Sequence, residues 1–173
     1  MQFLRKIFEK PKAISTAFYG SVLVGFVTIA IYYPLLPERM ASHFRFDGTP
    51  DAWSSKTVFA LINLALLAFV AFIFWGLDRL IQTIPVSSIK LPNKEYWLEP
   101  SRRDRTILKV IALNYLIGIA TNVLLIYIEI STFNAHLSSG TPRLGFEIWM
   151  AIALYVLVTV LLSLSPIFIF KRG

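Results

Sequence analysis

Four long apolar stretches constrain the fold of this chain more than any other feature of its sequence. They cover approximately residues 13–33, 57–77, 107–130 and 146–170, and the charged residues are gathered between them. Each stretch is close to the roughly 20 residues that an α-helix needs to cross the hydrocarbon core of a bilayer. Charged residues make up only 16% of the 173 residues, compared with about a quarter in soluble domains. The pattern predicts an all-α integral membrane protein with four transmembrane helices in a single membrane domain, residues 1–173.

The basic residues are unequally shared between the two sides of such a protein. Thirteen of the 17 Lys and Arg residues lie in the N-terminal segment, in or beside the segment between the second and third stretches, and at the C-terminus. The two remaining loops hold four. Because lysine and arginine concentrate on the cytoplasmic side of membrane proteins, both termini are expected in the cytoplasm (N-in/C-in). The loop of residues 34–56 is then expected outside the cell, and His43 and His136 share that side.

Local signals predict how individual helices begin. Met1–Lys12 combines basic and apolar residues at helical spacing, which predicts a short helix lying on anionic headgroups. The first apolar stretch follows it without a cleavage pattern, as in a retained signal anchor. Ser54 or Ser55 is expected to cap the second helix, and Pro100 suits the first turn of the third.

Small and polar residues interrupt the stretches at helical spacing. Ser21 and Gly25 predict close packing against another helix. The third stretch carries four residues that are expected on one helix face: Asn114, Gly118, Asn122 and Glu129. Amides and glycine inside a membrane helix usually face other helices. Glu129 lies near the outer end of the stretch and is expected to reach water.

The loop of residues 34–56 predicts an ordered structure outside the membrane. Asp47-Gly48 is a tight-turn signal, and polar and apolar residues alternate over residues 43–47, which predicts a short strand. A second turn is expected at Thr49-Pro50-Asp51. The aromatic side chains of this loop would pack it onto the helix ends.

The same loop carries a motif of unusual residue types at fixed spacing. Its elements are Tyr-Pro-x-Leu-Pro-Glu-Arg over residues 33–39, His43-Phe44, and Asp47-Gly48-x-Pro-Asp-x-Trp-x-Ser-Lys over residues 47–56. The motif resembles a small bacterial membrane-domain family of unknown function that occurs in SdpI-type immunity proteins. Residues 93–103 resemble a second pattern of that family. The resemblance implies a bacterial inner- or plasma-membrane protein and implies no reaction.

SdpI-type proteins protect a cell from a secreted toxic peptide and hold a transcriptional repressor at the membrane. They are longer, and this chain is expected to lack their additional spans. What the resemblance implies for this chain is recognition of a ligand or partner by the outer loop, in immunity or signalling. We expect its binding residues among these: His43, Phe44, Asp47, Asp51, Trp53 and Lys56. Each of them has the alternative role of capping the bundle.

A second group of residues is expected to meet the cytoplasmic surface of the membrane. Aromatic side chains anchor at headgroup depth and arginines attract anionic lipids. We expect contact with lipid or a protein partner from these residues: Tyr96, Trp97, Arg102, Arg103 and Arg105. The basic residues flank apolar stretches, so no nucleic-acid partner is expected.

Catalytic and metal-binding roles find little support in the sequence. The four stretches hold no His or Asp, and the chain has no Cys, so we expect a protein that is not an enzyme and has no cofactor. A metal site would need His43 with neighbouring acids, or His43 and His136 meeting across loops, and no metal-ligand spacing supports either. The predicted function is a non-enzymatic multi-pass envelope protein. The alternatives are an accessory subunit of a larger membrane complex and a small transporter. The expected partners are the lipid bilayer and either another protein or further copies of the same chain.

Overall fold

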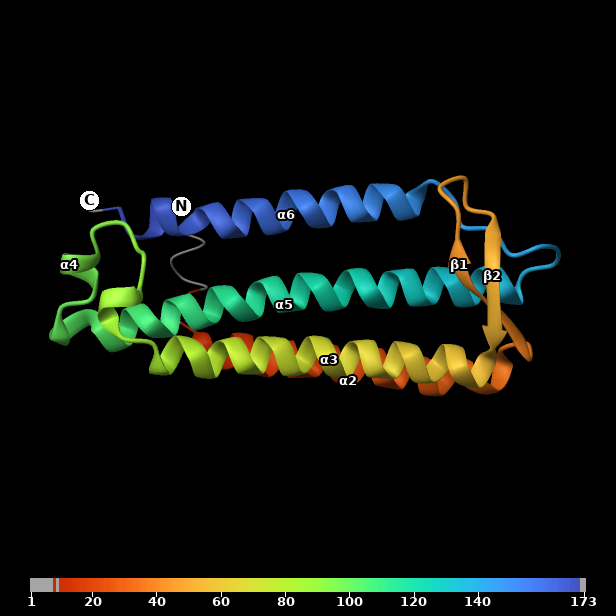
Figure 1. Cartoon of the computed structure of the whole chain (residues 1–173), viewed down its shortest axis with the longest axis horizontal. Helices are drawn as coiled ribbons and strands as arrows, with labels where there is room; N and C mark the ends of the chain where they lie inside the picture. Colours follow the sequence, from red (N-terminus) through yellow and green to blue (C-terminus); the bar gives the residue numbers. More distant parts are fainter. Residues whose placement is uncertain (1–7, 9, 172–173) are drawn as a thin grey trace.

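Four long helices run alternately up and down in the computed structural model, which describes Phe8 and residues 10–171. They are α2 (Pro11–Tyr32), α3 (Lys56–Thr83), α5 (Pro100–Leu137) and α6 (Glu147–Ile169) (Figure 1). All four are long and apolar enough to cross a membrane. The expectation of four such helices is therefore confirmed.

The two ends of the bundle differ. A β-hairpin lies across one end, hereafter the hairpin end, and is built from β1 (Arg39–Phe44) and β2 (Pro50–Ser55). The short helix α4 (Lys94–Trp97) lies at the other end, hereafter the opposite end, near the end of α6 (Figure 1). Single 3₁₀ turns, η1 (Tyr33–Leu35) and η2 (Val86–Ser88), complete the connections.

The hairpin corrects the expected all-α class. β1 and β2 pair antiparallel, with register irregularities on either side of His43. The turn closes through hydrogen bonds from Arg45 N to Thr49 O (2.8 Å) and from Gly48 N to Arg45 O (2.9 Å). The tight turn at residues 47–48 was thus predicted correctly, but β1 ends before it. The expected second turn at Pro50 is wrong because β2 begins there.

The helices extend beyond the apolar stretches that predicted them. α3 continues to Thr83, and α5 continues to Leu137 through residues assigned to a loop. Helical hydrogen bonds can continue into polar sequence. The hydropathy of the sequence therefore indicates the apolar part of a helix but not the residues at which the helix ends. The cap and the proline were predicted correctly: Ser55 Oγ accepts from Val58 N (3.3 Å), and Pro100 stands in the first turn of α5. The predicted interfacial helix at Met1–Lys12 falls largely outside the described residues.

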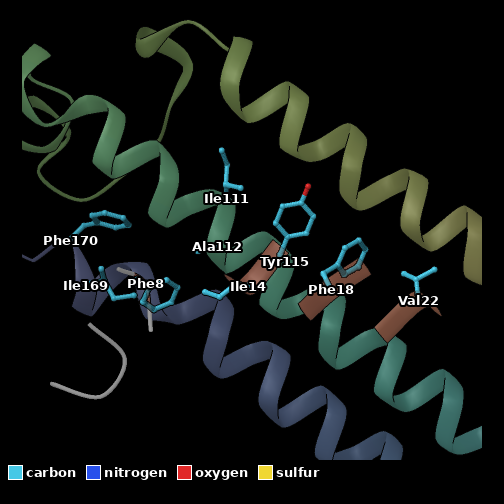
Figure 2. Close-up of a cluster of buried hydrophobic side chains, with 9 residues drawn as sticks. All are labelled: Phe8, Ile14, Phe18, Val22, Ile111, Ala112, Tyr115, Ile169 and Phe170. Carbon is cyan, nitrogen blue, oxygen red and sulfur yellow. The ribbon is translucent and has the colours of Figure 1, made fainter. Parts of the chain in front are cut away.

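α5 is the central helix and packs on each of the other three. Figure 2 shows α2 side chains such as Phe18 meeting Tyr115 of α5. Lipid tails are as apolar as leucine, so these contacts stabilise the bundle by close fit and hydrogen bonding. Gly25 faces Leu67, and Ser21 Oγ accepts from Asn122 Nδ2 (2.9 Å). The expected packing role of Ser21 and Gly25 is confirmed.

α6 is the most weakly held of the long helices. It packs mainly on α5, and a hydroxyl pair, Thr121 Oγ1 and Tyr155 Oη at 3.1 Å, joins the two. Its buried residues are Ile148, Ser165 and Ile169. Most of its apolar surface therefore faces outward, as expected of a helix in contact with lipid.

Candidate functional site

A histidine of α5 fastens the hairpin to the bundle. Nε2 of His136 accepts a hydrogen bond from Ala41 N (2.8 Å), and Nδ1 donates to Thr132 O (2.8 Å). This pair of contacts requires the proton on Nδ1 and a lone pair on Nε2. Met40 and Ala41 are fully buried beside it. β1 is thereby fixed over the end of α5.

The turn of the hairpin is fastened to the loop before α6. Gly48 O accepts from Leu144 N (3.0 Å), and the Arg143 guanidinium donates twice to Asp47 O (3.3 and 3.2 Å). Trp149 Nε1 donates to Phe46 O (3.0 Å), and their rings lie 4.4 Å apart. Gly48 has φ of 81°, and a Cβ there would overlap the Leu144 carbonyl. Only glycine fits this position without strain.

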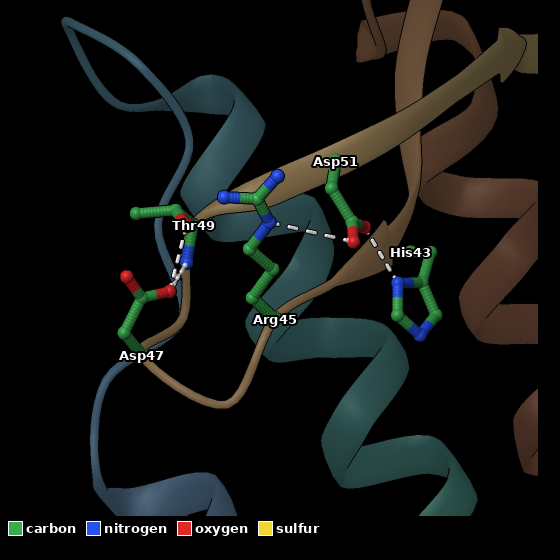
Figure 3. Close-up of polar contacts among 5 residues, drawn as sticks. All are labelled: His43, Arg45, Asp47, Thr49 and Asp51. Atoms are coloured by element: carbon green, nitrogen blue, oxygen red, sulfur yellow. Dashed lines mark hydrogen bonds and ion pairs between the residues drawn. The ribbon is translucent and has the colours of Figure 1, made fainter.

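An exposed polar network links the two strands (Figure 3). His43 Nδ1 lies 2.5 Å from Asp51 Oδ1, and Arg45 Nε lies 3.6 Å from Asp51 Oδ2. The His43 hydrogen bond lowers the pKa of Asp51 below its ordinary value. Thr49 donates to Asp47 Oδ1 from Oγ1 (2.6 Å) and N (3.0 Å), and these bonds lower the pKa of Asp47. In their ionised form, Asp47 therefore stabilises the turn and Asp51 the pairing of the two strands.

The remaining loop residues predicted to bind are placed apart from this network. Lys56 Nζ pairs with Glu38 Oε1 (2.8 Å) at the start of α3. Trp53 and Phe44 each meet the His136 ring edge-to-face, with centroids 6.1 and 6.3 Å away. The hairpin thus brings together His43 with Asp51 and, separately, Phe44 with Trp53.

A cavity of about 330 Å³ lies beneath the hairpin. This volume falls at the lower end of the range of small-molecule sites. Of the loop residues predicted to bind, His43 and Phe44 line it. The rest of its wall comes from β1, the hairpin turn, helices α3, α5 and α6, and the loop before α6: Ala41, Ser42, Arg45, Gly48, Phe59, Ile62, Asn63, Ile128, Glu129, Thr132, Leu144, Ile148 and Trp149.

Glu129 is the residue of this cavity that sequence reasoning misjudged. It is 4% exposed, so the expectation that it reaches water is wrong: α5 continues for two further turns and the hairpin covers that end. Its Oε2 atom is buried and has no hydrogen-bond partner among the described residues. A buried polar group without a partner is costly, and an acid within a membrane helix is by default a candidate functional group. Its isolation in an apolar stretch, on the face shared with Asn122, was the available signal.

The histidines do not come together as metal ligands. His43 is bound to Asp51, and His136 is bound to the Ala41 amide. Over residue 8 and residues 10–171, no group of three His, Cys, Asp or Glu side chains is arranged to hold a metal ion.

At the opposite end, three of the predicted surface residues tie secondary structure elements together. Trp97 Nε1 donates to Phe170 O (2.6 Å), which joins α4 to the end of α6. Arg102 donates to Tyr96 O (3.0 Å), pairs with Glu99, and stacks on the Tyr96 ring at 3.9 Å. These contacts give Tyr96, Trp97 and Arg102 structural roles, while their contact with lipid stays a prediction.

The four long apolar helices are compatible with a multi-pass membrane protein. The model of a family described as a domain of unknown function (DUF1648) matches residues 20–68. This segment comprises the second half of α2, the hairpin and the first half of α3. The match confirms the resemblance of the hairpin motif to a domain of unknown function and does not extend to residues 93–103. No curated protein and no solved structure matches the chain.

Proposed function

We propose that this chain is a non-enzymatic protein of the bacterial cell membrane that recognises an amphipathic ligand in the cavity beneath its hairpin, in an immunity or signalling role. One observation carries the proposal: the Glu129 carboxyl lies in the wall of that cavity, 4% exposed and without a hydrogen bond to any described residue. Ligand sites characteristically combine apolar walls with a few polar groups that fix orientation.

The composition of the cavity favours a ligand with an apolar body and a hydrogen-bond-donating, cationic group. Apolar side chains such as Phe59, Ile62 and Ile148 dominate the helical wall. Arg45 in the cavity wall lies close to Asp51. Glu129 therefore remains available to accept a hydrogen bond from a donor group of the ligand. A lysine side chain or the terminal amine of an apolar peptide has this chemistry, which agrees with the toxic-peptide context of SdpI-type proteins.

The proposed orientation places the cavity on the outer side of the membrane, with both termini in the cytoplasm. Its support is the distribution of Lys and Arg, which are concentrated at the opposite end. A ligand secreted by another cell would then meet the hairpin first.

The experiment is a tolerance assay with cationic amphipathic peptides. Deletion of the gene should sensitise the cell, and the wild-type chain should restore tolerance. Glu129→Gln should fail to restore it although it accumulates in the membrane. Glu147→Gln is the matched control, because Glu147 is an exposed acid at the same end that does not line the cavity. Unchanged tolerance after deletion would contradict the proposed role.

Two other experimental outcomes would favour one of the alternative functions over ligand recognition. Co-purification with a large membrane complex at fixed stoichiometry would identify an accessory subunit. Flux of a solute into proteoliposomes that depends on Asn122, whose Oδ1 atom is buried without a partner among the described residues, would identify a transporter.

A further inference from the structure

A second cavity, of about 570 Å³, opens at the opposite end between α2, α3 and α5. It shares no residue with the cavity beneath the hairpin. Its wall combines aromatic and aliphatic side chains with five charged residues: Lys12, Asp78, Arg79, Arg103 and Asp104.

The acid on α3 is fully engaged by its neighbours. Tyr115 Oη donates to Asp78 Oδ2 (2.9 Å), and Gln82 Nε2 donates to Asp78 Oδ1 (2.7 Å). Tyr19 extends this hydrogen-bond network, with its hydroxyl oxygen 3.3 Å from that of Tyr115. Asp78 therefore serves as the acceptor of a network in the cavity wall, and it makes no ion pair with the cations of the cavity among the described residues.

The cations of this cavity are poorly paired. Arg79 makes no ion pair with the described residues, and its guanidinium lies 5.7 Å from the Trp75 ring. Arg103 reaches Asp104 only at 3.9 Å, and its Nε is buried without a hydrogen-bond partner among the described residues. Lys12 likewise has no acid partner within the described part of the chain. Donors on three helices thus surround one opening.

The rest of the wall is apolar. Trp75 is exposed and lines the cavity beside the cations, and tryptophan is enriched at membrane–water interfaces. Ile107, Leu108 and Ile111 line the α5 side. An arginine binds phosphate oxygens through parallel N–H donors, and basic pockets between membrane helices receive anionic headgroups.

From this geometry we propose that the cavity binds an anionic phospholipid. Arg79, Arg103 and Lys12 receive its phosphate, and its glycerol and acyl portion lies against Trp75 and Leu108. Three arginines of residues 102–105 were predicted to contact lipid or a protein partner. Of these, Arg103 is the one proposed to bind the phosphate, because Arg102 is bonded to Tyr96 and Glu99. Arg105 is exposed and does not line the cavity.

The test is a lipid titration of the purified full-length chain in detergent, followed by its Tm. Phosphatidylglycerol should raise Tm more than phosphatidylcholine with the same acyl chains. Arg79→Gln with Arg103→Gln should lose about tenfold or more in apparent affinity for phosphatidylglycerol. Lys90→Gln with Lys171→Gln removes the same charge from exposed sites that do not line the cavity and should retain the response. Equal responses to the two lipids, or an equal loss in the control pair, would overturn the proposal.

Two further measurements keep the test decisive. Glycerol 3-phosphate alone should not reproduce the Tm shift; if it does, the ligand is a soluble phosphate ester and the lipid assignment is wrong. Native mass spectrometry of the wild-type chain in an equal mixture of the two lipids needs no variant to fold. Adducts should be enriched in phosphatidylglycerol, and adducts at the mixing ratio would contradict the site.

Discussion

Nε2 of His136 in α5 accepts a hydrogen bond from the backbone amide of Ala41 in β1, across 95 residues of sequence. This contact joins the hairpin to the central helix, and Ala41 also lines the cavity that contains Glu129. Since His136 and Glu129 stand two turns apart on one helix, the position of the hairpin and the shape of the cavity are set by the same element.

His136→Ala should loosen the hairpin. It leaves the N–H of the buried residue Ala41 without an acceptor, which costs about 1–3 kcal/mol. Hydrogen exchange at the β1 amides should therefore accelerate by about tenfold or more. Ser139→Ala is the control, because Ser139 is exposed just beyond the end of α5, at the same end of the bundle. Equal acceleration in both variants would show that His136 is not the anchor.

Gly118→Val should destabilise the bundle. A Cβ at Gly118 would lie 2.6 Å from Phe18 Cε2 and 3.1 Å from Phe74 Cδ1, and Phe18 is fully buried, so the ring has no room to move. Overpacking of this kind costs about 1–3 kcal/mol, which should appear as a lower Tm in detergent. Gly76→Val is the matched control, because a Cβ there meets nothing within 4 Å. A Tm unchanged by Gly118→Val would contradict the close approach of α2 and α5.

The hairpin should lose stability in acid. The pKa of Asp51 is lowered from its ordinary 3.8 by the hydrogen bond from His43. Its stabilising contribution is therefore complete above that value and disappears as the pH falls through the lowered folded pKa. Asp51→Asn should exchange hairpin amides faster than wild type near neutral pH, and the two should converge below pH 3.8. If Asp51→Asn still exchanged faster than wild type at strongly acidic pH, the ionised Asp51 carboxylate would not be the source of the stabilisation.

The orientation has a direct chemical test because the chain has no cysteine. Ser42 lies at the hairpin end and Ser101 at the start of α5, and both are exposed. In intact cells, an impermeant thiol reagent should label Ser42→Cys and should label Ser101→Cys only after the membrane is opened. The reverse pattern would overturn the outward position of the hairpin.

The four membrane helices were predictable because lipid leaves an apolar segment few ways to satisfy its backbone other than a helix. The turn at Gly48 was predictable from local chemistry. The strand beginning at Pro50 was not, because Pro-Asp is also a turn signal and the strand exists through its pairing with β1. The burial of Glu129 was not predictable either, because its cover comes from segments distant in sequence, β1 and the loop before α6.

The different roles of the two histidines also depend on contacts with segments that are distant in sequence. Sequence placed His43 and His136 on one side of the membrane and singled out His43 as the candidate for binding. The structure gives the anchoring contact to His136 and leaves His43 exposed beside Asp51. No local pattern distinguishes these roles, since each depends on which backbone group another segment presents.

The proposed recognition of a cationic, apolar group at Glu129 can be measured with octylamine as the smallest probe. Binding of the labelled amine to the purified chain in nanodiscs, corrected for empty nanodiscs, should be saturable, and octanol should compete poorly. Hydrogen bonds to charged groups contribute about 1.5–3 kcal/mol, so Glu129→Gln should weaken binding by about tenfold or more, while Glu147→Gln should not. Equal affinity of Glu129→Gln and wild type for octylamine would contradict the account.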